Sequence, residues 1–269
     1  PDGTLLATAG DDRTARIWDT VTGQPRAVLT DHGREVWAVA FSLLGAGENR
    51  IHRLAQLWAR MLLALSSIPV EISGLRHVLL DRPQIFAANH QSDIDTLVAL
   101  ACIPVQFRWI AKQELFSIPL FGTAMRNAGY IPIDRRNHDS ALRSLENAAQ
   151  IIRRGRSVMT FPEGTRSGDG TIQPFKQGVF HLAISAGVPV VPVTIIGSGA
   201  IMRKRSLKIT PGGVKLIFDK PIDAANYSIE TRHQLIDEVR NTIVENYRND
   251  SSPPKPGSAA HHTGIKKGV

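Results

Sequence analysis

The 269-residue sequence has few of the residues that disulfide-rich and metal-stapled proteins depend on. Its only cysteine, Cys102, cannot form an internal disulfide bond, and no group of Cys and His has the spacing of a structural zinc site. A chain of this length buries about 70–75% of the surface that its unfolded form exposes, so its core needs no such support. No metal is therefore expected.

Long apolar runs and glycine-rich loops are also missing. The most apolar stretch, residues 54–65, contains Gln56 and Arg60 and falls short of the roughly 20 residues that cross a membrane. The glycines at 197 and 199 lack the third glycine of a dinucleotide-binding loop, and no P-loop or nucleophile elbow occurs. No signal peptide precedes these segments, and the first residue is Pro1 rather than Met, so a piece of a longer chain is expected.

Positive charge is in excess, but it is unevenly placed. The net charge is +8, of which residues 1–43 contribute −2, residues 44–250 contribute +7 and residues 251–269 contribute +3. A basic chain can bind nucleic acid, an anionic membrane or a small anionic substrate. Aromatic residues make up only 6% and do not alternate with the basic run at 203–208, so a nucleic-acid partner is not expected.

The two ends of the chain differ from its middle. Residues 1–43 alternate short strand-like runs with turns at Asp2-Gly3 and Thr22-Gly23, and with Trp18-Asp19 they resemble one blade of a WD-repeat propeller. A single blade has no neighbour to bury its faces, so an independent domain is not expected. The junction near 43–47 is either a fusion artefact or a degenerate extension, and residues 251–269, rich in Pro, Gly and Ser, are expected to be a disordered tail.

A helix is predicted over residues 50–66. Apolar residues recur there at three- and four-residue spacing, with Arg50, Arg53 and Arg60 between them. Such a helix either lies in the interface of an anionic membrane or packs on its own domain. The first alternative predicts a peripheral membrane protein on the cytoplasmic face.

From residue 84 onward, strand and helix patterns alternate. Strands are expected at 84–90, 107–112, 124–134, 157–161, 188–197 and 214–222, and helices at 92–102, 138–153, 175–187 and 228–248. This order predicts an α/β domain over residues 44–250, an αβα sandwich around a mixed, mostly parallel central sheet. Pro189 and Pro192 predict that the strand at 188–197 is a shaped sheet edge.

The segment 89–95, NHQSDID, carries the first candidate for chemistry. A histidine at the tip of a strand, followed after four residues by an aspartate in the first helical turn, can act as a general base that the carboxylate orients. A helix capping box from Ser92 to Asp95 explains the aspartate equally well, and both alternatives stay open here.

Three further strand ends carry polar or unusual residues. The segment 161–167, FPEGTRS, places a carboxylate, a turn glycine and Arg166 in one elbow, which suits a phosphate and its neighbouring hydroxyls. The segment 129–135, GYIPIDR, sets Arg135 after another strand, and 188–193 is the proline-containing strand. Either arginine taken alone is equally well a solvated surface charge, and Asp134 is a possible partner for Arg135.

These four segments, in this order, resemble the 1-acylglycerol-3-phosphate acyltransferase family (PlsC-type) over residues 50–248. The resemblance implies that His90 is the base that deprotonates a lysophospholipid hydroxyl and that Asp95 orients it. It also implies that Arg135 and Arg166 bind the acceptor phosphate with help from Lys112, and that Glu163, Gly164 and Thr165 shape the acceptor pocket. Neither a metal nor another cofactor is implied.

The resemblance further implies that the acyl donor is an acyl-CoA or acyl carrier protein thioester and that the acceptor is lysophosphatidate or a related lipid. Hydrolysis of the thioester is the alternative within the enzyme class, because a His/Asp base activates water as well as an alcohol. A WD-repeat interaction scaffold is the non-enzyme alternative. Many family members begin with a longer hydrophobic segment, so the native membrane anchor is expected to be missing if residues 1–43 are an artefact.

Overall fold

The computed structural model of the protein describes residues 5–9, 14–19, 25–30, 47–118, 121–134, 138–204 and 208–250. Its strands are β1 (Leu5–Ala9), β2 (Thr14–Asp19), β3 (Pro25–Thr30), β4 (Val70–Ser73), β5 (Ile85–Ala88), β6 (Phe107–Lys112), β7 (Ile131–Ile133), β8 (Ser157–Thr160), β9 (Val190–Ile196) and β10 (Val214–Phe218). Its α-helices are α2 (Glu48–Leu65), α3 (Ile94–Cys102), α4 (Phe121–Asn127), α5 (His138–Arg153), α6 (Gly178–Ala186), α7 (Ser198–Ile201) and α8 (Arg232–Asn249).

The first three strands form an antiparallel sheet in the order β1-β2-β3, with Leu5 opposite Asp19 and Thr14 opposite Thr30. These strands coincide with three of the runs expected in the blade-like segment. The fourth run, at 36–42, and the tail at 251–269 lie outside the described residues.

The remaining strands form a seven-stranded sheet in the order β4-β10-β9-β5-β8-β6-β7. The five strands from β9 to β7 run parallel to one another, whereas β10 pairs antiparallel with β9 and parallel with β4. The sheet is therefore mixed and mostly parallel, as expected. Because parallel strands share one carboxyl edge, the carboxyl ends of β5, β6, β7 and β8 lie on the same side of the sheet.

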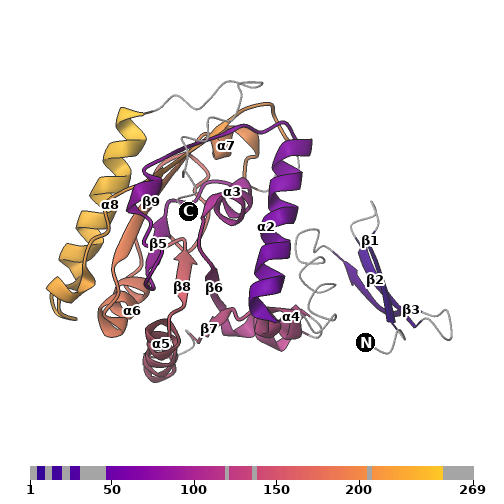
Figure 1. The fold of residues 1–269 in the computed structure, drawn as a ribbon, viewed down its shortest axis with the longest axis horizontal. Coiled ribbons are helices and arrows are strands. Elements are labelled where there is room, and N and C mark those ends of the chain that lie inside the picture. Colours follow the sequence, from indigo (N-terminus) through magenta and orange to yellow (C-terminus); the bar gives the residue numbers. More distant parts are fainter. Residues whose placement is uncertain are drawn as a thin grey trace, which may run out of the picture.

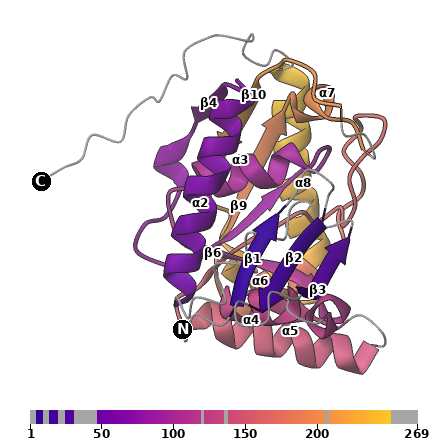
Figure 2. The same ribbon diagram turned by 90° about the vertical axis from the view of Figure 1, so that its right-hand side faces the viewer.

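Helices cover both faces of this sheet (Figures 1 and 2). The helices α2 and α3 lie on one face, and α5, α6 and α8 lie on the other. Each face has its own apolar core, one built around Phe86, Phe107 and Phe218 and the other around Phe180 and Ile152. The architecture is the αβα sandwich that the alternating pattern predicts.

Burial follows from the position of each strand. Every residue of β5, β8 and β9 is buried, because helices cover both faces at the centre of the sheet. Such strands read as continuous apolar runs. In β4 and β10, near the edge, burial alternates from residue to residue. The helix α8 buries Leu235, Val239 and Ile243, which lie at four-residue spacing on one side.

Two local predictions were wrong. The segment expected to be a strand from 124 onward begins as helix α4, and only Ile131–Ile133 extends as β7. The strand with the prolines is central rather than an edge, since β9 lies between β10 and β5. Pro192 is tolerated there because the pairing with β10 is interrupted beside it. The Asp219 N–H donates to the Pro192 carbonyl at 3.0 Å, and the next pairing along β9 is an isolated antiparallel bridge between Val190 and Ile222.

Candidate active site

Two adjacent central strands deliver the first two motifs to the carboxyl edge of the sheet. The strand β5 leads into His90, and its neighbour β8 leads into Phe161 and Glu163. Main-chain bonds join the two loops: the Ser167 N–H donates to the His90 carbonyl at 2.8 Å. The sheet therefore brings together segments that are about 70 residues apart in the sequence.

The histidine and aspartate of the first motif form a pair. The Nδ1 atom of His90 lies 2.8 Å from Oδ2 of Asp95, whose side chain is fully buried while that of His90 is 15% exposed. The bond to Asp95 leaves Nε2 as the ring nitrogen that can exchange a proton. This is the geometry of a general base held by a carboxylate.

Asp95 also binds backbone groups of the turn that leads into α3. Its Oδ2 accepts the backbone N–H groups of Gln91 and Ser92, both at 2.8 Å, and the Ser92 hydroxyl accepts the Ile94 N–H at 3.2 Å. The same carboxylate therefore binds two N–H groups of the turn before α3 and holds the imidazole ring. This geometry is compatible with both alternatives left open by the sequence.

Stacking fixes the plane of the histidine ring. The rings of His90 and Phe161 are nearly parallel, 9° apart, with centroids separated by 3.9 Å, and Trp109 of β6 stacks beyond Phe161 at 5.6 Å. The sequence singled out neither aromatic residue for this role. Phe161 was visible only as part of the 161–167 motif, and nothing in the sequence pattern marked Trp109.

Glu163 points into the protein rather than outward. It is 3% exposed, accepts the His90 N–H on Oε1 at 2.6 Å and accepts the Gln173 N–H on Oε2 at 2.9 Å. Burial raises the pKa of Glu163 to about 7, although these two bonds oppose the shift. Glu163 therefore supports the backbone of the histidine loop, which differs from the pocket-lining role that the resemblance implies.

Residues 164–166 of the elbow are exposed or partly exposed. Gly164 adopts φ +71°, a left-handed conformation that suits glycine, and Thr165 is exposed. Arg166 forms an ion pair with Asp93. Lys204, from the basic run after α7, donates to the Arg166 carbonyl at 2.7 Å. The sequence did not associate Lys204 with this loop.

Of the other two predicted cations, the structure describes only Lys112. Lys112 ends β6 and is exposed, on the face of the strand opposite to Trp109 and Ala111. Arg135 lies outside the described residues, directly after Asp134.

A cavity of about 450 Å³ opens beside His90. It is lined mainly by apolar side chains of α2, α3, α4 and β6, among them Trp58, Leu97, Trp109 and Met125. A cavity of this character suits an apolar ligand or part of one. In the described part of the chain, no group of three or more His, Cys, Asp or Glu side chains could hold a metal ion.

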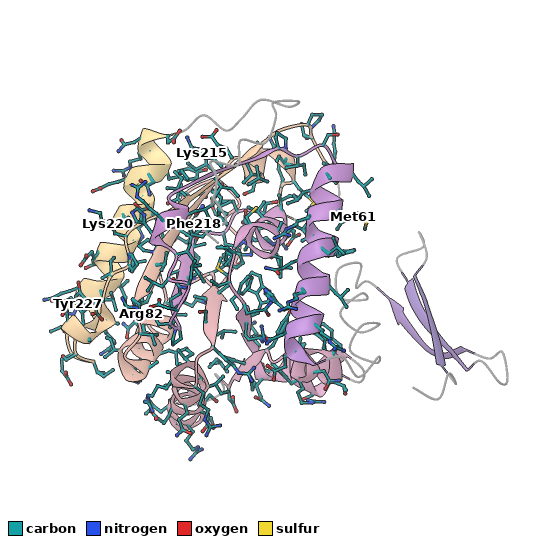
Figure 3. All side chains as sticks on the ribbon, in the orientation of Figure 1. Met61, Arg82, Lys215, Phe218, Lys220 and Tyr227 are labelled. Atoms are coloured by element: carbon teal, nitrogen blue, oxygen red, sulfur yellow. The ribbon has the colours of Figure 1, made fainter. Side chains whose placement is uncertain are left out.

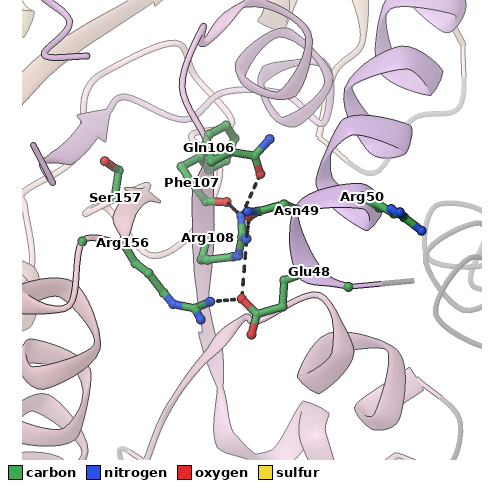
Figure 4. Close-up of a pocket in the computed structure, with 10 residues that line it drawn as sticks. Glu48, Asn49, Arg50, Gln106, Phe107, Arg108, Arg156 and Ser157 are labelled. Atoms are coloured by element: carbon green, nitrogen blue, oxygen red, sulfur yellow. Dashed lines mark hydrogen bonds and ion pairs between the residues drawn. The ribbon is translucent and has the colours of Figure 1, made fainter. Parts of the chain in front are cut away.

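A second, larger cavity lies elsewhere and carries different residues. It has a volume of about 640 Å³ and lies by the amino ends of β6 and β8, at the sheet edge opposite to His90. There Glu48 pairs with both Arg108 and Arg156 (Figure 4). Its lining includes neither His90 nor Asp95. It is therefore separate from the candidate site at His90.

Comparisons with known proteins identify the family and the fold. Residues 69–196 match the acyltransferase family model, and residues 1–19 match the WD domain, G-beta repeat model. The crystal structure of the 1-acyl-sn-glycerophosphate acyltransferase PlsC from Thermotoga maritima superposes with a TM-score of 0.65 at 27% identity, covering 79% of this chain and 86% of that one.

Curated relatives carry the same name. A chloroplastic 1-acyl-sn-glycerol-3-phosphate acyltransferase of Brassica napus is 35% identical over 84% of this chain, and the human alpha enzyme is 32% identical over 72%. This chain spans 60% of the Brassica napus protein, 53% of its Arabidopsis thaliana counterpart and 69% of the human one. From the motif geometry, the fold and these relatives, the chain belongs to the acyltransferase family that contains the 1-acyl-sn-glycerol-3-phosphate acyltransferases.

Proposed function

We propose that this chain transfers a fatty acyl group from an acyl-CoA or acyl carrier protein thioester to the free hydroxyl of 1-acyl-sn-glycerol-3-phosphate, giving phosphatidate. The observation that carries the proposal is the pair of His90 and Asp95, 2.8 Å apart, beside an apolar cavity of about 450 Å³. The names of the relatives support this choice of acceptor.

In the proposed reaction, Nε2 of His90 takes the proton of the acceptor hydroxyl as the oxygen attacks the thioester carbonyl carbon. Asp95 stabilises the imidazolium that forms. The C–O bond forms, the C–S bond breaks, and the proton on His90 passes to the departing sulfur. The products are an ester and a free thiol, and no acyl-enzyme is needed.

The apolar cavity is the proposed place for an acyl chain. Side chains of α2 and α3 form much of its wall, and His90 lies at its margin. Each methylene group that moves from water into such a cavity contributes about 0.8 kcal/mol. Binding there would hold the reacting end of the acyl group near the base.

The acceptor phosphate is proposed to bind near the elbow at 161–167. Arg166 is a candidate, but a phosphate must compete with Asp93 for its guanidinium. Lys112 is the last residue of β6, and Arg135 follows β7 in the sequence. Both remain candidates because the carboxyl ends of these two parallel strands lie on the same edge of the sheet.

An anionic membrane surface is proposed as the place where the lipid acceptor is met. Among helices in the described ranges, none is long and apolar enough to span a membrane. One side of α2 nevertheless exposes Leu57, Met61 and Leu65, and Figure 3 shows Met61 pointing away from the sheet. Arg50 and Arg53 are exposed on the same helix. This combination suits a helix lying in a lipid interface.

Product analysis tests the proposal. The purified chain is incubated with 1-oleoyl-lysophosphatidate and radiolabelled oleoyl thioester, with CoA and acyl carrier protein compared as donors. We expect labelled phosphatidate and free thiol in equal amounts. Labelled oleic acid without phosphatidate would show a hydrolase and overturn the proposal.

A further inference from the structure

Lys176 lies against the elbow that follows β8. It comes just before α6, and its backbone N–H donates to the Pro162 carbonyl at 2.9 Å. This bond attaches the start of α6 to the elbow. The position of Lys176 relative to Gly164 is therefore set by the fold and not only by a flexible side chain.

The Lys176 side chain runs across Gly164. A Cβ atom at residue 164 would lie 2.6 Å from Nζ of Lys176 and 2.8 Å from its Cε, closer than such atoms approach. The absence of a side chain at Gly164 thus leaves room for the ammonium group to rest on the elbow. Gly164 has two roles here: it permits the positive φ, and it permits this close approach.

Lys176 differs from the other cations described at this elbow. Arg166 is paired with Asp93, and Lys204 donates to the Arg166 carbonyl. No hydrogen bond or ion pair to the Lys176 ammonium occurs within the described part of the chain. An anion arriving at the elbow would meet this charge without displacing a carboxylate.

The space beside the ammonium group can receive such an anion. A cavity of about 240 Å³ is lined by Gly164 and Lys176, together with Ile110 of β6 and Ile133 of β7. Lys112 lies on the same face of β6 as Ile110, two residues farther along the strand. Phe161 lines both this cavity and the larger one beside His90.

We infer that Lys176 binds the phosphate group of the acceptor, with the elbow at Gly164 as its support. This inference rests on the proposed function, since it gives a place to the phosphate of the lysolipid whose hydroxyl reaches His90. In this arrangement Lys176 supplies the charge that the phosphate meets first. Arg166, held by Asp93, orients the loop that presents it.

The test uses the full chain and two substitutions at one position. Lys176→Met keeps the aliphatic stem over Gly164 and removes the charge, whereas Lys176→Arg keeps the charge. Lys220→Ala is the control, because Lys220 is exposed after β10, near the opposite sheet edge (Figure 3). Binding of sn-glycerol 3-phosphate is measured by isothermal titration calorimetry, and KM is measured separately for lysophosphatidate and for the acyl thioester.

We expect Lys176→Met to weaken glycerol 3-phosphate binding and to raise KM for lysophosphatidate by about tenfold or more, as the loss of a charged hydrogen bond does. KM for the thioester should not change, and Lys176→Arg should restore most of the loss. Unchanged glycerol 3-phosphate binding in Lys176→Met would overturn the inference, as would a rise in KM for acyl-CoA alone, which would assign Lys176 to the donor phosphates. If the unmodified chain makes no phosphatidate, the proposed function fails, while the titration still decides the role of Lys176.

Discussion

One oxygen atom of Asp95 serves both the fold and the proposed chemistry. Its Oδ2 accepts from Gln91 N–H, from Ser92 N–H and from the His90 ring, while its Oδ1 is buried and has no hydrogen-bond partner among the residues that the structure describes. A buried carboxylate used this way stabilises a positive charge on the imidazole. Removing the charge of Asp95 should therefore lower stability through its backbone contacts and lower turnover through its contact with His90.

Asp95→Asn tests this double role. We expect turnover to fall by about a hundredfold or more, because the amide carries no charge to stabilise the imidazolium. We also expect the free energy of unfolding to fall by about 1–3 kcal/mol, because an amide NH₂ at the Oδ1 position has no acceptor. Steady-state kinetics and urea unfolding measure the two effects.

Ser92→Ala is the matched control for Asp95→Asn. It removes the hydroxyl that accepts the Ile94 N–H and donates to the Met202 carbonyl, without touching His90. It should lower stability and spare turnover. If Asp95→Asn behaves in the same way, Asp95 is a helix cap only.

Glu163 gives the pH dependence of stability a definite sign. Burial raises its pKa from about 4.5 to about 7, so between these values the folded protein holds a proton that the unfolded chain has lost. The free energy of unfolding then falls as pH rises from 4.5 to 7, by about 3 kcal/mol from this group, and is level above 7.

Glu163→Gln should remove this slope. Unfolding by urea at pH 5, 6, 7 and 8 measures it, and the variant is compared with the unmodified chain at each pH. We expect the difference between the two proteins to favour the variant increasingly as pH rises. A variant that keeps the slope of the unmodified chain would show that another group titrates in this range.

At the scale of elements, α2 has one packed side and one exposed side. Its packed side buries Ile51, Ala59 and Leu63. The opposite row is formed by Leu57, Met61 and Leu65, which are 64%, 49% and 74% exposed. One arginine that the sequence assigned to lipid is already engaged, since Arg60 donates through Nε to the Ala101 carbonyl at 2.9 Å.

Replacing the exposed row tests the membrane role of α2. The triple variant Leu57→Gln, Met61→Gln and Leu65→Gln should bind vesicles containing phosphatidylglycerol at least about tenfold more weakly. Glutamine is a good helix former and the positions are exposed, so stability should change by about 1 kcal/mol or less. Vesicle flotation measures the binding, and Leu142→Gln, on exposed Leu142 of α5, is the control. Equal flotation of all three proteins would exclude this face.

The sequence predicted elements best where a pattern was long or closely bounded. The helix at 138–153 and the strand at 107–112 have the expected limits, because periodicity or flanking turns defined them. The helix α4 was missed because FGTAMRN is short and contains a glycine, and β4 was missed because four residues carry little pattern. Pro189 and Pro192 led to the wrong prediction of an edge strand, because the sequence does not show that the hydrogen-bond ladder between β9 and β10 is interrupted beside Pro192.

In the candidate site, too, only contacts within one short segment could be predicted from the sequence. Local spacing was enough to pair His90 with Asp95, since both lie in one strand-to-helix turn. The inward role of Glu163, the stacking of Phe161 and the ion pair of Arg166 with Asp93 depend on contacts between distant segments. Residue spacing does not encode such contacts.

At the scale of the whole molecule, two sheets divide the chain. The described strands β1 to β3 pair only with one another, and the seven-stranded sheet carries both apolar cores. Deleting residues 1–43 should therefore leave a cooperative thermal transition with a Tm changed by only a few degrees, as differential scanning calorimetry measures. Loss of the cooperative transition would contradict the division at residue 44.

The whole account depends on His90 acting as the base at the carboxyl edge of this sheet. The most direct measurement is the rate of phosphatidate formation by His90→Ala, with circular dichroism to verify folding. The account predicts a fall of about a hundredfold or more in a folded protein, because the ring lies in a loop after β5 and not in the core. A folded His90→Ala protein that keeps most of the activity would contradict it.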